Sequence, residues 1–372
     1  MNVLILSARA PVALEWARHF QAASWHVFLA DHQAGRLSCQ KVLPHTFIPT
    51  PAAAQNPHIY IQTLAQAIHT HKIDWLIPTC EEIFYIAKFQ ALLPSSCRIL
   101  CADFQILQNL HNKYVFNQLA QDLGLHAPAT VRLQNNQDTS WQMDTARIVK
   151  PLFSRFGHQV LALSPYQTIP THIPLNGSWL VQECVQGQEY CSYSLAISGR
   201  LLAHQSYQGL YRYKKGASFY FDPIVHAGIQ TQVERVVQAL NFSGQISFDW
   251  MVNHDHQAYV LECNPRATSG LHLLPHNGSL LNALLNETPI ANYQPKAKML
   301  LPMMYLHALP QAAAQGTLKK WYQDYQRADD VLQHWSHHVG SLQDAYYFYR
   351  VCRQQNIPLE AATAVDFAWN GD

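Results

Sequence analysis

An alternation of short apolar segments with helical segments over the first hundred residues constrains the fold most. Residues 3–6 are apolar, residues 11–22 carry apolar side chains at helical spacing, and residues 26–30 are apolar again. The same order recurs in the helical ranges 58–71 and 82–92 and in the strand ranges 74–78 and 98–101. This alternation is typical of an open parallel sheet covered by helices. We therefore expect a Rossmann-like α/β domain over residues 1–102.

The pattern changes in the middle of the chain. Residues 103–124 read as one helix, which Gly124 ends. Short strands then predict an α+β unit over residues 103–295, with a lid at about 128–183 and a terminal hairpin. These strands are expected at residues 147–151, 160–163, 179–185, 190–197, 201–207, 245–252 and 257–264, with a helix at 231–240. The function of residues 296–372 is unread; the aromatic side chains at 346–349 and Trp369 could pack on the core, cover a pocket or form a homodimer contact.

Composition excludes several classes of protein. Only 13% of the 372 residues are charged, and 25 Lys and Arg balance 24 Asp and Glu. A nucleic-acid binder needs a clustered basic excess, so we expect no nucleic-acid partner. We also expect no membrane partner, because no apolar run approaches the roughly 20 residues that span a bilayer. The eight cysteines form no CxxC pair, which favours reduced thiols and a cytoplasmic location.

Acidic side chains mark the predicted hairpin. Asp249 points away from the apolar face of its strand, and Glu262 and Asn264, two residues apart, share one face of the returning strand. If Asp249 lies opposite Glu262, three oxygen-bearing side chains converge, which suits Mg²⁺ or Mn²⁺. The alternative is a pair of solvent-facing acids. The apolar neighbours of Glu262 favour the metal interpretation.

Two lysines and a glycine-bearing turn suggest an anion site. Lys150 ends an apolar strand before a turn that contains Ser154 and Gly157, and Lys113 could reach the same anion. Taken alone, each lysine is better explained as a surface side chain with a buried stem. The GxxxxGK[ST] phosphate loop is absent. A strand with a following turn could frame a base and a ribose through Gln182, Glu183, Val185 and Glu189.

Further polar residues are candidates for binding substrate. The ends of predicted parallel strands carry an arginine that could bind a carboxylate and two acids that could bind an ammonium group. A basic loop could clamp a carboxylate, and a hydroxyl with a glycine before a helical stretch could bind an anion. Each candidate type has a structural alternative. An acid at a helix start could be there because the helix dipole favours it, the basic loop could be a solvated turn, and the hydroxyl with the glycine could be an ordinary helix cap. These candidates are Arg9, Glu81, Glu82, Arg212, Ser269 and Gly270.

In order and approximate spacing, these elements together resemble the ATP-grasp superfamily over roughly residues 1–290. The most specific element is the Glu-x-Asn-Pro-Arg segment at 262–266. The chain looks closest to stand-alone carboxylate–amine ligases related to the carbamoyl phosphate synthetase large subunit and biotin carboxylase, with a pre-ATP-grasp domain at 1–102. The resemblance implies an ATP-dependent ligase that forms an acyl phosphate and joins it to an amine.

The resemblance also assigns roles to residues. It implies that Lys113 and Lys150 contact ATP phosphates and that Arg266 stabilises the transferred phosphoryl group. It further implies that residues 182, 183 and 185 frame adenine and that Glu189 binds the ribose. The acids and the amide of the hairpin are expected to hold Mg²⁺, as two ions. The turn has one Gly where the family commonly has several, so its closure could depend on Arg155 or on residue 158.

Two other functions remain open at this point. Asp31 ends the second strand, where an NAD-dependent oxidoreductase would bind ribose, although no GxGxxG turn precedes it. A non-catalytic nucleotide-binding protein is the second alternative. The sequence identifies neither the carboxylate nor the acceptor, which could be an amine, a thiol or bicarbonate.

Overall fold

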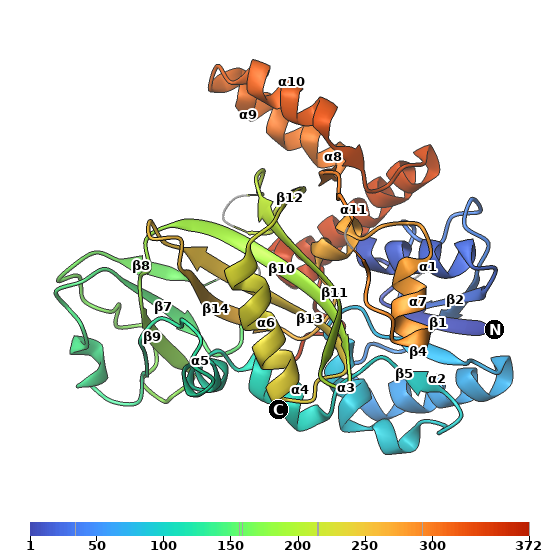
Figure 1. The fold of residues 1–372 in the computed structure, drawn as a ribbon, viewed down its shortest axis with the longest axis horizontal. Helices are drawn as coiled ribbons and strands as arrows, with labels where there is room; N and C mark the ends of the chain where they lie inside the picture. Colours follow the sequence, from blue (N-terminus) through green and yellow to red (C-terminus); the bar gives the residue numbers. More distant parts are fainter. Residues whose placement is uncertain (34, 156, 158, 214–215, 292, 372) are drawn as a thin grey trace.

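The computed structural model describes every residue except 34, 156, 158, 214–215, 292 and 372 and the side chain of 360. A parallel five-stranded sheet forms its N-terminal part. Helices α1 (Pro11–Ala22), α2 (Pro57–His71) and α3 (Glu82–Lys88) connect its strands, as the alternation predicted (Figure 1). The 3₁₀ turn Gln90–Leu92 follows α3. The strand order is β3 (Thr46–Pro49), β2 (His26–Asp31), β1 (Asn2–Leu6), β4 (Trp75–Ile77) and β5 (Arg98–Ile99).

Local chemistry explains where these elements begin. Pro11 and Pro57 stand in the first turns of α1 and α2, where the missing N–H costs nothing. Strands β1 and β4 are buried along almost their whole length, as expected for parallel strands covered on both faces. Strand β3 was not predicted, because four residues at a sheet edge carry little periodicity.

The single helix predicted at 103–124 is wrong in one respect: it is two helices, α4 (Phe104–His111) and α5 (Lys113–Asp122). Asn112 separates them in an extended conformation, and its side-chain oxygen accepts hydrogen bonds from the backbone N–H groups of Tyr114 and Val115. An asparagine in this role is a strong N-cap. The break makes Lys113 the first residue of α5.

A second, four-stranded antiparallel sheet lies at the opposite side of the molecule from β1 (Figure 1). A buried arginine holds its loops: the Arg147 guanidinium donates to the carbonyl groups of Thr139, Trp141 and Gln167. The 3₁₀ turn Asp138–Ser140 precedes it. The strand order is β6 (Thr130–Arg132), β9 (Trp179–Glu183), β7 (Arg147–Pro151) and β8 (Leu161–Leu163).

A seven-stranded sheet occupies the centre, with helix α6 (Ala227–Ala239) across it (Figure 1). The predicted hairpin is present as β13 and β14. The short strands β12, β15 and β16 were not predicted. The order is β14 (Ala258–Asn264), β13 (Gly244–Val252), β10 (Gln188–Ile197), β11 (Arg200–Gly209), β12 (Tyr220–Ile224), β15 (Lys298–Met299) and β16 (Asp329–Asp330).

The C-terminal residues are mainly helical. Helices α8 to α10 project from the central sheet, whereas the last residues return to α3 and α4 (Figure 1). Within the described part of the chain, no helix is both long enough and apolar enough to cross a membrane. The elements after β14 are the 3₁₀ helix η3 (Ser269–Leu273), α7 (Ser279–Asn286), α8 (Leu301–Met303), the π-helix Met304–Ala308, α9 (Leu309–Ala314), α10 (Leu318–Arg327), α11 (Trp335–Gln355) and α12 (Leu359–Ala362).

Candidate active site

The register of the β13–β14 hairpin places the two predicted acids side by side. Asp249 is the cross-strand partner of Glu262, and the register shifts directly after Asp249. The amide of Asn264 donates to Asp249 Oδ2 at 3.5 Å. The three oxygen-bearing side chains therefore converge as the alternation of the strands predicted.

Both predicted lysines reach this hairpin. Lys113 Nζ lies 3.4 Å from Glu262 Oε2 and donates to the carbonyl oxygen of Ser154 at 3.1 Å. Lys150 Nζ, from β7, donates to the carbonyl oxygen of Leu261 at 3.3 Å. Both lysines are buried. Cations from α5 and from the four-stranded sheet thus meet the acids of the central sheet.

Mutual proximity perturbs the pKa values of these groups. Burial, reinforced by the negative charge of Glu262, raises the pKa of Asp249 to about 7. Burial would also raise the pKa of Glu262, but Lys113 and Lys150 outweigh it and lower that pKa to about 2. Burial lowers the pKa of Lys150 to about 8, against the opposing charge of Glu262. Two adjacent carboxylates do not readily ionise together, because their negative charges repel each other. Together they form an oxygen donor set that fits a divalent cation such as Mg²⁺.

Two arginines lie beside this cluster and share one carboxylate. Arg266 Nη2 is 3.5 Å from Asn264 Oδ1 and 3.9 Å from Glu81 Oε1. Arg155 Nε donates to Glu81 Oε2 at 2.6 Å. Burial would raise the pKa of Glu81, but His111 and the two arginines lower it to about 2. In this structure the Glu81 carboxylate is thus already paired, and its predicted role in holding a substrate ammonium group stays a prediction.

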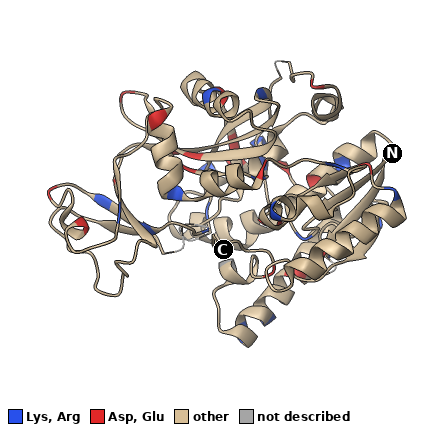
Figure 2. Ribbon diagram, turned by 90° about the horizontal axis from the view of Figure 1, so that it is seen from below, with Lys and Arg blue, Asp and Glu red and all other residues tan. Residues whose placement is uncertain are grey.

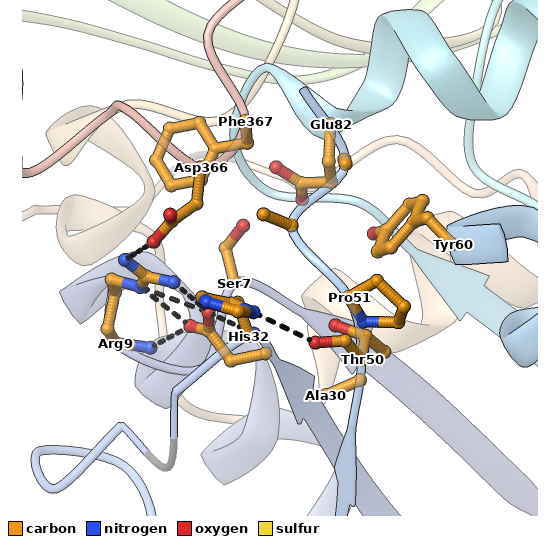
Figure 3. A pocket seen from close by; sticks show the side chains of 13 residues that line it. Ser7, Arg9, Ala30, His32, Thr50, Pro51, Tyr60, Glu82, Asp366 and Phe367 are labelled. Atoms are coloured by element: carbon orange, nitrogen blue, oxygen red, sulfur yellow. Dashed lines mark hydrogen bonds and ion pairs between the residues drawn. The ribbon is translucent and has the colours of Figure 1, made fainter. Parts of the chain in front are cut away.

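The other predicted substrate residues at the parallel sheet are also engaged within the protein. Arg9 pairs with Asp31 and, at 2.7 Å, with Asp366 from the C-terminal tail (Figure 3). Glu82 accepts from the backbone N–H groups of Thr79 and Cys80, as a helix-start acid does. The cavity among these side chains measures about 20 Å³, room for about one water molecule.

The residues predicted to frame the nucleotide lie along β9 and the start of β10. Gln182 is buried and donates to Thr130 Oγ1 at 2.9 Å, and Glu183 accepts from the N–H of Ala129 at 3.3 Å. Val185 lies in the connection that follows. Glu189 and Arg212 were predicted separately, but the structure brings them together at 2.6 Å. Gly157 is exposed with a φ of +63°, and residue 158, one candidate for closing the turn, lies outside the described residues.

The helical stretch predicted after Ser269 and Gly270 is instead the short 3₁₀ helix η3, so it offers no extended helix terminus to an anion. Ser269 is its first residue. A Cβ on Gly270 would lie 2.5 Å from Tyr193 Cβ and 2.9 Å from Tyr207 Cε1. Close packing against two tyrosines therefore accounts for this glycine.

Sequence reasoning left the role of the C-terminal tail open and did not predict its contacts with the site. The Trp369 N–H donates to Glu81 Oε2 at 3.0 Å, and its carbonyl oxygen accepts from Arg155 at 2.5 Å. His111, buried against Phe84, was also not singled out. No local signal predicts these contacts, since 288 positions separate Glu81 from Trp369.

The whole molecule is sparsely charged, with both signs dispersed over the ribbon (Figure 2). Against this background, two lysines, two arginines and three acids gather where the three sheets approach one another. An arrangement of this kind can bind a polyanion together with a divalent cation.

Part of this chain matches a known family, and its fold is similar to solved structures. Residues 110–270 match the family model described as an ATP-grasp domain. None of the curated protein sequences that were compared matches the chain. Among solved structures, N5-carboxyaminoimidazole synthetase from Staphylococcus aureus is 14% identical over 80% of both chains, with a TM-score of 0.59.

Two further solved structures share the fold. An L-amino acid ligase from Bacillus licheniformis is 16% identical over 80% of this chain and 78% of its own, with a TM-score of 0.59. Biotin carboxylase from Campylobacter jejuni is 10% identical over 78% and 72%, with a TM-score of 0.60. Most residues of the site described above lie within 110–270, the part of the chain that matches the ATP-grasp domain.

Proposed function

We propose that this chain is an ATP- and Mg²⁺-dependent carboxylate–amine ligase that releases ADP and phosphate. The observation that carries the proposal is the meeting of Lys113 and Lys150 with the Asp249, Glu262 and Asn264 cluster. Structures that share this fold include a Staphylococcus aureus synthetase complexed with ADP and a biotin carboxylase domain in complex with MgADP and bicarbonate. The fold and the cluster together support ATP as the nucleotide.

The residues divide the chemistry among them. Lys113 and Lys150 bind the phosphates and offset their charge. Asp249, Glu262 and Asn264 would hold Mg²⁺, and we propose two ions. When bound, Mg²⁺ supplies charge neutralisation at the β- and γ-phosphates. Gln182, Glu183 and Val185 are proposed to frame adenine, and Glu189 to bind ribose once Arg212 is displaced.

The reaction itself requires no nucleophilic side chain. A substrate carboxylate oxygen bonds to the γ-phosphorus while the bond to the β,γ-bridging oxygen breaks, so ADP leaves and an acyl phosphate forms. The amine nitrogen then bonds to the acyl carbon, phosphate leaves, and the nitrogen loses a proton. Arg266 stabilises the charge on the transferred group. Closure of the four-stranded sheet would keep water from the acyl phosphate.

The site assignment is tested by substitution. In Glu262→Gln and Arg266→Ala we expect substrate-dependent ADP release to fall at least about a hundredfold, because each change removes charge that faces the phosphates. The controls are Glu234→Gln and Arg353→Ala, which are exposed and are not among the residues of the proposed site. ADP release is measured over carboxylate and amine pairs, with mass detection of the joined product. Wild-type rates in both site variants would overturn the assignment.

The oxidoreductase alternative is weaker because Asp31 is occupied. Its carboxylate binds the side chain and the backbone N–H of Arg9 and the N–H of His32, so a ribose would have to displace a buried ion pair. We expect ATP with Mg²⁺, but not NADH, to raise the melting temperature. Stabilisation by NADH alone would favour the oxidoreductase. The cytoplasmic location, a homodimer and the division at residues 102 and 295 are proposed on the sequence grounds given above.

A further inference from the structure

A carboxylate and three imidazoles meet where α1 packs against η3 and the residues after it. Glu15 and His19 lie one turn apart on α1, His272 lies in η3, and His276 lies just beyond it. One ligand atom each from Glu15, His19 and His276 lie within 4.8 Å of one another. None of these four residues belongs to the proposed ATP site.

One buried atom of this cluster, His19 Nε2, has no hydrogen-bond partner. It lies 3.8 Å from Glu15 Oε1. The other carboxylate oxygen, Glu15 Oε2, is held by His272 Nδ1 at 2.9 Å. Because buried polar atoms are almost always satisfied in native proteins, an unpartnered ring nitrogen that faces a carboxylate oxygen indicates a missing ion or water.

Neighbouring groups complete the surroundings of the cluster. His276 Nε2 is in direct contact with Glu15 Oε1, and the rings of His19 and His276 stack with centroids 4.3 Å apart. Arg18 lies 3.8 Å from Glu15 Oε2, the oxygen turned away from His19, and its guanidinium donates to the carbonyl groups of Val331 and Leu332. The face of Glu15 that meets the two histidines therefore carries no cation of the described chain.

We propose that Glu15, His19 and His276 bind one divalent transition-metal ion of the Zn²⁺ class. Two imidazoles and one carboxylate form a donor set that Zn²⁺ accepts, whereas Mg²⁺ prefers oxygen ligands alone. His272 acts as a positioning residue, because its hydrogen bond to one carboxylate oxygen orients the other toward the ion. An ion pair between Glu15 and a protonated His276 would leave His19 Nε2 without a partner.

The exposure of the ligands gives the route of entry. His19 and Glu15 are buried, whereas the side chain of His276 is 34% exposed. The two imidazole planes differ by only 8°, so their lone pairs do not yet converge. Binding requires the exposed His276 ring to tilt, and the ion enters from that side. Once bound, it links α1 to the segment that follows Arg266.

The test uses the full chain without a histidine tag, treated with a chelator and titrated with ZnCl₂ alone. We expect one equivalent to bind and to raise the melting temperature. In His276→Gln, whose side chain is at the surface, affinity should fall at least about tenfold and the thermal shift should be lost. His254→Gln, an exposed histidine in the β13–β14 turn, is the matched control and should behave as wild type.

A second readout separates this site from the eight free thiols. Co²⁺ in the wild-type protein should give the visible absorption of a tetrahedral or five-coordinate site without a thiolate charge-transfer band, and His276→Gln should lose that absorption. The proposal is overturned if the wild type takes up no Zn²⁺, or if uptake and the cobalt spectrum are the same in His276→Gln.

Discussion

At the scale of single residues, the protonation of Lys150 should control nucleotide affinity. Burial lowers its pKa to about 8, so the ammonium form dominates below that pH and the neutral amine above it. Only the charged form attracts phosphate. We therefore expect ATP affinity to fall as the pH rises from about 7 to about 9.

This prediction is checked by calorimetric titration with ATP and Mg²⁺ at each pH. Lys150→Arg keeps its charge throughout this range and should lose the pH dependence. The control is Lys298→Arg, because Lys298 pairs with Asp329 at 3.5 Å and is not part of the proposed site. This variant should keep the dependence of ATP affinity on pH. If ATP affinity changes with pH in Lys150→Arg as it does in the wild type, another group causes the dependence.

The hairpin acids and the substrate candidates differ in how far the sequence could predict them. Period-two alternation in a hairpin sets which side chains share a face, so the convergence of Asp249 and Glu262 followed from local pattern. The partner of Arg9 did not, because Asp366 lies 357 positions away. Ion pairs of this separation depend on the tertiary fold, which local pattern does not encode.

At the scale of elements, the break between α4 and α5 positions a cation of the proposed ATP site. Asn112 caps α5, and the next residue, Lys113, points its ammonium group to Glu262. Apolar periodicity continues across the break, so the sequence predicted one helix. The capping hydrogen bonds to Tyr114 and Val115 override that periodicity.

We expect Asn112→Ala to lower stability by about 1 kcal/mol, the usual loss for a helix cap, and to weaken ATP binding severalfold because Lys113 loses its fixed position. Asp103→Ala removes the comparable cap of α4, which accepts from the N–H of Gln105 at 2.8 Å. It should cost similar stability and leave ATP affinity unchanged. Denaturant unfolding and ATP titration of both variants check this pair. Equal ATP affinity in the two variants would contradict the positioning role.

Element length also determined which strands were predictable. The predicted limits of α1 and β7 match the structure, because α1 carries several turns of apolar side chains and Pro151 marks the end of the apolar segment of β7. Strands β15 and β16 have two residues each and exist only by pairing with each other and with β12. Their pairing partners, and not their own composition, make them strands.

At the scale of the whole molecule, the C-terminus completes the core of the N-terminal part. Trp369 is 3% exposed and packs its ring on Phe84, Tyr85 and Phe104, with centroids 5.1 to 5.9 Å apart. In Figure 1 the last described residues lie beside α3 and α4. The last residues therefore act as part of the first structural unit. Their role was unreadable in the sequence because the aromatic partners lie more than 250 positions earlier.

This packing predicts that the side chain of Trp369 contributes a large share of the free energy of unfolding. Trp369→Ala should lower the free energy of unfolding by about 3–5 kcal/mol, the range for truncating a buried aromatic side chain. Trp335→Ala is the matched control, since Trp335 is 75% exposed and should change stability by less than about 0.5 kcal/mol. Denaturant unfolding monitored by circular dichroism measures both. Equal stability of the two variants would mean that the C-terminus is not integral to the core, because the cavity left by Trp369 would then cost no more than a surface change.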